Sequence, residues 1–298
     1  MTLTGKTISQ LPSSSGLTGT EVLPIELSGV TLQTTVQDIA NLAGGIIAVG
    51  TGAGSTVRIG NNNTASGTYS TVSGGQYNAA SGQTSTIGGG RSNTASNSYS
   101  TIGGGLINTA SGTRSTIGGG CYNTASGIDS TIGGGINNGA SGDRSTIGGG
   151  RGNIASATHA TIGGGRTNTA SGSYSKIGGG RSNGASGLVS TVGGGQSNGA
   201  SGDRSTIGGG QSNTASGIRS IIGGGSSNTA SGSYSGILGG RDNSTNNCTC
   251  TMIVGACITA DRACTTFVNN LSIMNIPTSS AGLPSGAVWN DSGTLKII

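Results

Sequence analysis

Polar and apolar positions recur along most of this chain with a period of fifteen residues. Asn occurs at every fifteenth position from Asn63 to Asn243, which gives thirteen copies without a gap. In twelve of them Ala follows two residues later, and Ile or Val follows seven residues after that Ala, as in Asn93, Ala95 and Ile102. Three consecutive glycines follow most of these apolar residues. Such a long, regular period indicates a repeat architecture.

The repeat is incompatible with helices and favours short β-strands. One Ile and one Ala per fifteen residues form no stripe with a period of 3.6 residues, and each Gly inside a helix costs about 1 kcal/mol. We expect two short strands per coil, one centred on Ala and one on Ile, with alternate residues of 93–97 and of 100–104 sharing a face. The sequence therefore predicts an all-β fold, a parallel β-solenoid or β-roll of fifteen-residue coils.

Two further columns are given structural roles by their composition. The Asn93 column is expected to form a ladder of stacked amides, each bonding to the next coil. The column of Asn97 holds Gly in ten other coils, for example Gly82 and Gly112, and Ala157 once. Because Gly with an occasional Asn is typical of left-handed positions, we predict a left-handed turn there, which Ala157 does not fit.

The triple glycines have two possible explanations. Gly103, Gly104 and Gly105 mark either a sharp turn of the coil or a place where the sheet of another chain approaches closely, because a column without Cβ atoms lets another backbone come near. One Ile and one Ala per coil bury little apolar surface compared with the entropy lost by fifteen ordered residues. We therefore expect an obligate oligomer in which several chains pack around one axis.

Composition narrows the class of protein further. The chain has 298 residues, of which 63 are Gly, while 8% are charged and 3% aromatic. The net charge of +5 comes without a Lys/Arg run or interleaved aromatic residues, so we expect no nucleic-acid partner. The longest early apolar run, residues 46–49, is far too short to span a membrane, and residues 1–16 show no signal-peptide pattern.

Catalytic chemistry has few candidates, so no catalytic, cofactor-binding or metal-binding residue is predicted and the chain is not expected to be an enzyme. A glycosidase needs two facing carboxylates about 5–10 Å apart. Asp143 and Asp203 share a column but lie four coils apart, about 19 Å at the usual strand spacing. His159, the sole His, is expected to be a surface residue. A polysaccharide depolymerase that uses carboxylates at a trimer interface is the enzymatic alternative.

The five cysteines cluster mostly where the repeat degenerates: Cys121, Cys248, Cys250, Cys257 and Cys264. Continuing the fifteen-residue count puts Cys250 in the Ser column and Met252 in the Ile column, with apolar residues in place of glycines. We expect a more apolar cap there with small buried thiols. Disulfides and a metal site are the alternatives.

The variable columns are the most informative surface of the repeat. Tyr and Arg are common in one of them, and such side chains on a rigid surface suit contact with a glycan or a protein. A second variable column holds Arg91, Arg151, Arg166, Arg181 and Arg241. Solvated decoration of the surface is the alternative for both columns. The candidate binding residues of the first column are Tyr69, Tyr99, Arg114, Arg144, Tyr174, Arg204, Arg219 and Tyr234.

The repeat STIGGG followed by NTASG resembles the head repeats of trimeric autotransporter adhesins. In that family the head is a left-handed parallel β-roll, and three chains make one stem. The resemblance covers residues 60 to 260 and implies a parallel homotrimer. This chain has one more residue per coil than the adhesin repeat, and we expect no membrane-anchoring strands after it.

Both ends resemble segments of phage tail-fibre proteins. In residues 1–45 we predict strands at 21–27 and 30–34 and a short helix that begins near Thr35 and Asp38. The end, AGLPSGAVWNDSGTLKII, resembles a closing hairpin, with strands at 287–289 and 294–298 around a turn at 290–293. The expected divisions are an attachment segment (1–45), a transition (46–59), a shaft (60–243), a cap (244–264) and a hairpin tip (265–298).

A viral fibre is therefore the expected function. The chain would be a structural tail-fibre or appendage subunit in a virion that positions host-binding surface. Its partners would be copies of itself, other virion proteins through the N-terminal segment, and a host surface glycan or protein. The alternatives are a bacterial surface adhesin or extracellular filament subunit, located at the cell surface, and an ice-binding solenoid. Thr94 and Ser96 put hydroxyls on one face, but the Thr column is broken in five coils.

Overall fold

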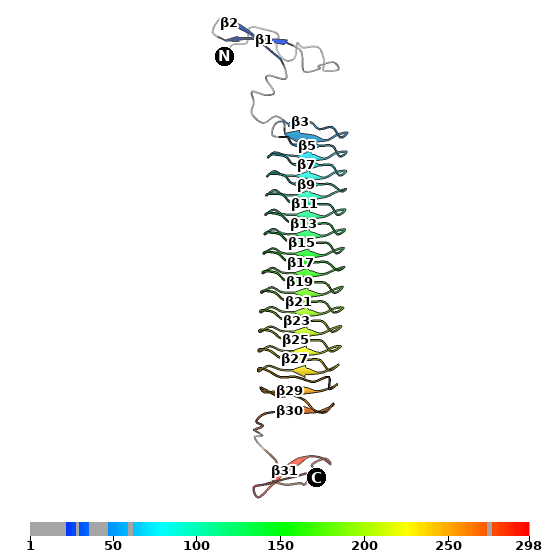
Figure 1. Cartoon of the computed structure of the whole chain (residues 1–298), viewed down its shortest axis with the longest axis vertical. Coiled ribbons are helices and arrows are strands. Elements are labelled where there is room, and N and C mark those ends of the chain that lie inside the picture. The colour runs from blue at the N-terminus through cyan, green and yellow to red at the C-terminus, as the bar shows by residue number, and fades with distance from the viewer. Residues whose placement is uncertain (1–21, 28–29, 36–46, 59–61, 273–275, 298) are drawn as a thin grey trace.

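The computed structural model describes residues 22–27, 30–35, 47–58, 62–272 and 276–297. Its main body is a parallel β-solenoid of about 14 turns, drawn as one tall stack in Figure 1. The stack includes the predicted shaft but begins before it, at β4 (Thr56–Arg58), and continues beyond it through β29 (Met252–Val254) and β30 (Thr266–Val268). The all-β fold and the fifteen-residue coil are confirmed, and no helix occurs among the described residues.

Two long sheets run along the stack. The first has 16 strands, and from β4 onward every neighbouring pair is parallel. Its strands are β3 (Ile47–Val49), β4 (Thr56–Arg58), β6 (Thr71–Val72), β8 (Thr86–Ile87), β10 (Thr101–Ile102), β12 (Thr116–Ile117), β14 (Thr131–Ile132), β16 (Thr146–Ile147), β18 (Thr161–Ile162), β20 (Lys176–Ile177), β22 (Thr191–Val192), β24 (Thr206–Ile207), β26 (Ile221–Ile222), β28 (Gly236–Ile237), β29 (Met252–Val254) and β30 (Thr266–Val268).

The second sheet has 12 parallel strands centred on the Ala column. They are β5 (Thr64–Ala65), β7 (Ala79–Ala80), β9 (Thr94–Ala95), β11 (Thr109–Ala110), β13 (Thr124–Ala125), β15 (Gly139–Ala140), β17 (Ile154–Ala155), β19 (Thr169–Ala170), β21 (Gly184–Ala185), β23 (Gly199–Ala200), β25 (Thr214–Ala215) and β27 (Thr229–Ala230). The two strands predicted for each coil are thus both present.

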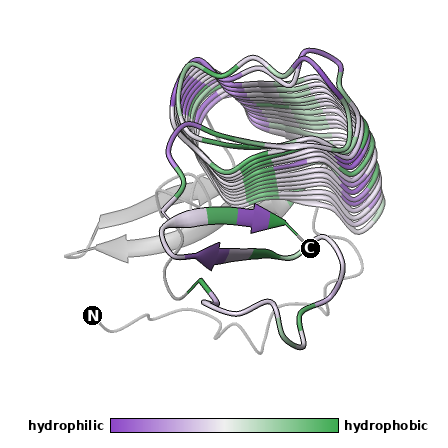
Figure 2. Cartoon of the chain, turned by 90° about the horizontal axis from the view of Figure 1, so that it is seen from below, coloured by the Kyte–Doolittle hydropathy of each residue, from purple (hydrophilic) through white to green (hydrophobic). Residues whose placement is uncertain are grey.

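A third ladder, which the sequence pattern did not predict, closes each coil. Isolated parallel bridges join equivalent residues of successive coils from Gln76 to Arg241, including Arg91 with Leu106. Their residues follow the triple glycines directly. Viewed along the axis, successive coils superpose and residues of like hydropathy form continuous bands (Figure 2). The register is strict because equivalent residues pair with equivalent residues, as Thr101 does with Thr116.

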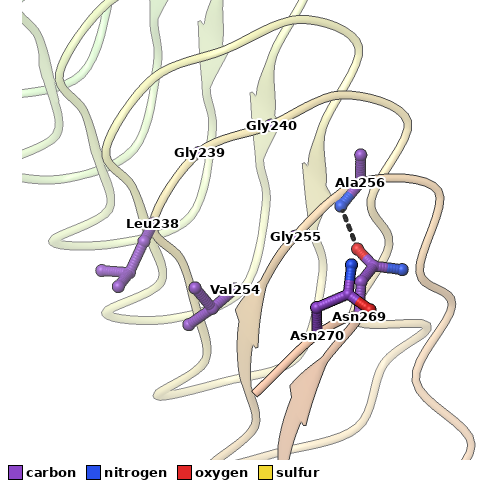
Figure 3. Close-up of a pocket in the computed structure, with 8 residues that line it drawn as sticks. All are labelled: Leu238, Gly239, Gly240, Val254, Gly255, Ala256, Asn269 and Asn270. Atoms are coloured by element: carbon purple, nitrogen blue, oxygen red, sulfur yellow. Dashed lines mark hydrogen bonds between the residues drawn. The ribbon is translucent and has the colours of Figure 1, made fainter. Parts of the chain in front are cut away.

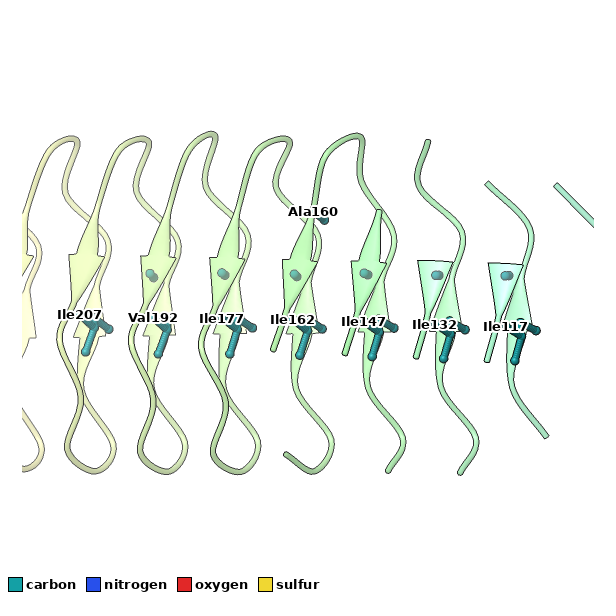
Figure 4. Close-up of a cluster of buried hydrophobic side chains, with 14 of the residues drawn as sticks. Ile117, Ile132, Ile147, Ala160, Ile162, Ile177, Val192 and Ile207 are labelled. Atoms are coloured by element: carbon teal, nitrogen blue, oxygen red, sulfur yellow. The ribbon is translucent and has the colours of Figure 1, made fainter. Parts of the chain in front are cut away.

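The core lies inside each coil and is complete within one chain. The Ala and Ile columns are buried with at most 1% of their surface exposed, and the Ile side chains stack one above the other (Figure 4). The Asn and Ser columns point into the same interior. A single chain therefore buries the apolar core for which the sequence indicated help from other chains. The trimeric state stays a prediction.

The asparagine ladder is confirmed. The backbone N–H of Asn108 donates to Asn93 Oδ1 at 3.0 Å, and Asn108 Nδ2 donates to the carbonyl oxygens of Gly104 at 3.1 Å and Gly120 at 2.8 Å. Each amide thus ties its own coil to both neighbours. Because a buried amide requires such partners, only Asn suits this column.

The predicted left-handed position is wrong by two residues. Positive φ falls not on the Asn97 column but on Tyr99 (φ 60) and its equivalents. The Asn97 column holds Gly for another reason: a Cβ on Gly82 would overlap the carbonyl oxygen of Asn97 in the next coil. Gly82 N–H also donates to Ala95 O at 3.2 Å. The equivalent bond is missing at Asn97 and Ala157, so Ala157 departs from the regular hydrogen bonding. Its φ is not positive, so this alanine needs no left-handed backbone.

Two of the three glycines in each triplet are explained within the chain. A Cβ on Gly103 would overlap the carbonyl oxygen of Gly118, and one on Gly105 would overlap that of Gly120. Gly105 also has φ +98, a conformation that L-residues rarely adopt. Neither requirement applies to Gly104, whose added Cβ would meet only atoms 3.9 Å away. The sharp-turn explanation therefore covers the outer glycines and leaves the middle one unexplained.

The predicted alignment of the cap is also wrong by one residue. Ile237 pairs with Ile253, so this coil has one extra residue, and Phe267 occupies the same column one coil later. Met252 therefore points outward, and Cys250 lies in the Tyr99 column instead of the Ser column. The extra residue lies in a loop where Asn246 and Asn247 both have positive φ.

The two ends form separate antiparallel hairpins. β1 (Val22–Leu27) pairs with β2 (Val30–Thr35), which confirms both predicted strands. The predicted helix lies outside the described residues. At the other end β31 (Val288–Asp291) pairs with β32 (Thr294–Ile297). The turn is shorter than predicted, with only Ser292 and Gly293 between the strands, both at positive φ as a type I′ hairpin turn requires.

Candidate functional site

All eight predicted binding residues lie on one edge of the solenoid. They occupy the corner between the Ala strand and the Ile strand of successive coils, each with φ between 54 and 60. We call this edge, made of the residues equivalent to Ser98 and Tyr99, the corner ridge. Tyr69, Tyr99, Tyr174 and Tyr234 each expose more than half of their surface. The left-handed backbone turns the side chains outward, so the fold presents them to solvent.

Several ridge side chains contact the next coil rather than standing free. Arg114 Nε and Nη2 donate to Asp129 Oδ1 and Oδ2 at 2.5 and 2.9 Å. His159 stacks on Tyr174 with ring centroids 4.7 Å apart. Arg219 lies over the Tyr234 ring and donates to its hydroxyl at 2.7 Å. Three of the ridge pairs therefore also tie coils together.

The ridge carboxylates have structural partners. The hydrogen bond from Arg114 holds the pKa of Asp129 below its usual range, with the guanidinium charge adding to the effect. Asp143 Oδ1 accepts from Ile128 N at 3.0 Å, and Asp203 Oδ1 accepts from Leu188 N at 3.0 Å. Each of these carboxylates satisfies a turn N–H one coil away. Within the described ranges, no group of three or more His, Cys, Asp or Glu side chains could hold a metal ion.

A second edge carries the arginines of the other variable column. Arg151, Arg166 and Arg181 occupy successive coils, and parallel bridges join each to the next. All three side chains are exposed. We call these three residues the arginine ladder. The two glycines before each arginine donate no hydrogen bond within the described part of the chain.

An open hollow lies where the shaft passes into the cap. It has a volume of about 680 Å³ and lies beside Gly239 and Gly240, in the columns of Gly104 and Gly105. Figure 3 shows Leu238 and Val254 on one side and Asn269, which accepts a hydrogen bond from Ala256 N at 2.6 Å, on the other. The sequence singled out none of these residues, because their columns are regular glycines until the last coils.

The cysteines are more exposed than predicted. Cys250, Cys257 and Cys264 are exposed, and Cys121 and Cys248 are half-buried. The three exposed thiols lie at corners with positive φ, where side chains point outward. Cys250 and Cys264 share the ridge column in the last two coils. Partial desolvation raises the pKa of the Cys250 thiol, and the neighbouring Cys264 thiol raises it further.

The fold defines this chain as a parallel β-solenoid repeat protein with non-repeat hairpins at both ends. It matches no protein-family model and no curated protein sequence. Among the described residues there is no helix long and apolar enough to cross a membrane.

Proposed function

We propose that this chain is the structural shaft of an extracellular fibre. One observation carries the proposal: an unbroken stack of nearly identical coils whose interior is filled and whose hydrogen bonds run from coil to coil along the axis. Such a rod holds its two ends at a fixed distance. Because the coils are nearly identical, the shaft is better suited to act as a spacer than to carry a single binding site.

A viral tail fibre is the particular fibre that we propose. The support is the resemblance of both non-repeat ends to phage tail-fibre segments, together with the hairpins β1–β2 and β31–β32 at those ends. The N-terminal segment would attach to other virion proteins. The corner ridge, with its exposed tyrosines and arginines, would face a host surface glycan or protein.

We further propose that three parallel copies assemble into the fibre. The adhesin-like repeat supports a trimer, and so does the need to fix register, because coils can slip by fifteen residues without changing their contacts. A non-repeat element such as the β31–β32 hairpin would set that register. Measurement of the mass in solution tests the trimer, and a stable folded monomer would contradict it while leaving the single-chain shaft intact.

The viral proposal is tested by locating the protein. Antibodies against residues 62–240 should label thin rods projecting from purified virions in electron micrographs. The rods should be about 70 Å long over the solenoid, from about 14 turns at roughly 4.8 Å each. Label on the surface of bacterial cells, with none on particles, would favour the adhesin alternative and overturn the virion assignment.

Ice binding is a second candidate, favoured by one feature of the 16-stranded sheet. Threonine occupies its outward column without a break from Thr56 to Thr161, and Lys176 interrupts the column before Thr191. This array is more regular than the Thr94 face. It is only one threonine wide, because the neighbouring outward column is glycine. Thermal hysteresis above that of a buffer control would favour this function, and its absence would remove it.

A further inference from the structure

The arginine ladder lies in a long stretch of the shaft that carries five positive charges and no negative charge. Residues 144–202 contain four Arg and one Lys but no Asp or Glu. Lys176 adds its charge in the same coil as Arg181, on the outward face of the neighbouring sheet. The flanking carboxylates, Asp143 and Asp203, lie on the corner ridge, where backbone N–H groups already bond to them. The ladder has no ion-pair partner among the described residues.

Backbone donors lie directly beside the ladder. In the three coils that carry it, the middle and last glycines of each triplet donate no hydrogen bond within the described chain. The middle glycines, Gly149, Gly164 and Gly179, leave open space where a Cβ would stand. An acid group on this edge would therefore find one guanidinium in every coil, next to backbone N–H groups that no other described residue uses. Such donors bind anions well because the backbone holds them in place.

We use the word strip for the arginine ladder together with the two glycines before each of its arginines. We propose that this strip binds an acidic polysaccharide that lies along the fibre axis and places its acid groups on Arg151, Arg166 and Arg181. The donors repeat at the coil spacing of roughly 4.8 Å, which calls for a linear polymer with regularly spaced charges rather than a single small anion. A pyranose unit of an extended polysaccharide is about as long as one coil. Thr167 and Ser182, whose hydroxyls lie 3.4 Å apart beside the ladder, suit contact with sugar hydroxyls.

The same surroundings argue against nucleic acid as the ligand. Single-stranded nucleic acids bind on aromatic platforms that stack on the bases. The residues that follow the ladder arginines are Gly152, Thr167 and Ser182, so the strip offers no aromatic platform. The strip is also a flat edge, with no helix or ribbon among the described residues that would enter a groove of a duplex.

This inference goes beyond the proposed shaft function, because a spacer needs no ligand and the strip would bind in either a viral or a bacterial fibre. It is tested with the full-length protein and three fluorescent probes: polygalacturonate, dextran sulfate and a single-stranded DNA oligonucleotide. Neutral dextran is the blank. We expect the two acidic polysaccharides to bind, with affinity that falls as salt rises. Preference between them would name the acid group as carboxylate or sulfate.

Matched variants distinguish binding at the arginine ladder from binding to positive charge in general. The ladder variant Arg151→Gln/Arg166→Gln/Arg181→Gln should bind at least about tenfold more weakly, since it loses three charge-assisted contacts. The control variant Arg91→Gln/Arg241→Gln/Arg262→Gln removes the same charge from exposed arginines outside the arginine ladder and the corner ridge, and should bind like the wild type. Equal loss in both variants would overturn the proposal, as would absence of polysaccharide binding or tighter binding of the DNA.

A glycine variant tests the backbone donors without touching charge. Gly149→Ala/Gly164→Ala/Gly179→Ala places methyl groups in open space, so the solenoid should keep its circular dichroism and melting behaviour. The methyl groups would stand beside the free N–H groups, and binding should weaken about three- to tenfold. Wild-type affinity in this variant would contradict the role of the glycines in the strip.

Discussion

At the scale of single residues, identical glycines have different reasons to be glycine. Gly105 combines φ +98 with a carbonyl oxygen of the next coil where its Cβ would stand. Gly103 meets only the second constraint, and Gly104 meets neither. The same residue type in three adjacent positions thus reflects backbone conformation, space between coils and, as we infer in the ladder coils, access for a ligand.

This difference predicts opposite outcomes for two neighbouring substitutions. Gly105→Ala should lower the free energy of unfolding by roughly 3 kcal/mol or more, because it adds left-handed strain and overlap with backbone. Gly104→Ala should leave it unchanged or raise it by about 0.5 kcal/mol by restricting the unfolded chain. Denaturant unfolding followed by circular dichroism measures both. Equal destabilisation would show that the middle glycine also has a structural requirement.

The Arg114–Asp129 pair predicts a local pH dependence. The pKa of Asp129 is lowered, so the pair adds stability above the pKa of the unfolded chain, about 3.9, and this stability disappears as pH falls through the folded pKa. Arg114→Gln should raise the pKa of Asp129, measured by NMR titration. Because the pair is on the surface, its effect on stability should be small and reduced by salt. An unchanged pKa would contradict this assignment.

At the scale of elements, the asparagine ladder is the part of each coil that tolerates substitution least. In the middle of the shaft Asn153 Nδ2 donates to Gly149 O at 2.9 Å and Gly165 O at 3.0 Å, and Asn168 N donates to Asn153 Oδ1 at 3.0 Å. Asn153→Ala leaves Gly149 O and Asn168 N without partners and removes one of the two donors to Gly165 O. We expect a loss of roughly 3–5 kcal/mol in the free energy of unfolding.

The Ser column provides a matched control at equal burial. Ser145 is fully buried, yet its hydroxyl has no hydrogen-bond partner, and Ala160 replaces the serine in the next coil. Ser145→Ala should therefore be neutral or stabilise by about 1 kcal/mol. Thermal unfolding of the two variants side by side makes the comparison. Similar losses in both would show that the ladder hydrogen bonds are not what makes the column invariant.

The last two coils predict a redox-sensitive contact. Cys250 and Cys264 occupy the same column of adjacent coils, where the Cys264 thiol helps to raise the pKa of the Cys250 thiol. The coil spacing of roughly 4.8 Å falls within the range that disulfides bridge. Glutathione disulfide should oxidise the two thiols to one disulfide, releasing two molecules of glutathione. Peptide mapping should find Cys250 linked to Cys264, and Cys250→Ser should abolish that product. A Cys257 link instead would contradict the arrangement.

Sequence periodicity predicted the elements well and the corners poorly. Ala95 and Ile102 mark their strands because burial imposes an apolar side chain once per strand in every coil. The sequence did not reveal the left-handed conformation of Tyr99, because its column includes Thr84 and Val189, β-branched residues that rarely adopt that conformation. The cap was misaligned because one inserted residue moves every later column, and only the pairing of Ile237 with Ile253 reveals it.

The candidate site was found only in part. The ridge residues were identified from composition, and the structure brings all eight to one edge. The arginine column was identified too, but its unpaired glycine N–H groups follow from the hydrogen bonds of the fold and carry no sequence signal. The bridge ladder at Leu106 was missed because its residues vary freely in polarity. Backbone pairing alone holds that face together.

At the scale of the whole molecule, interchangeable coils predict tolerance to internal deletion. Removing residues 94–123, two coils, joins identical surfaces and should leave a folded protein about 10 Å shorter. Removing residues 265–298 takes away β30 and the hairpin β31–β32, and should give misassembled or insoluble chains. Small-angle scattering measures the length and the assembly state. Loss of folding in the first variant, or normal trimers in the second, would refute the view of a spacer with a terminal clamp.

The axial direction of the hydrogen bonds has a mechanical consequence. Every coil is attached to its neighbours by the three parallel ladders and by its asparagine, so a pull on the two ends loads one coil boundary at a time. When the outermost coil peels away, the rod shortens by roughly 4.8 Å while about 50 Å of extended chain is released. Such a rod should be stiff at low force and lengthen stepwise at high force, as a tether that absorbs shocks would.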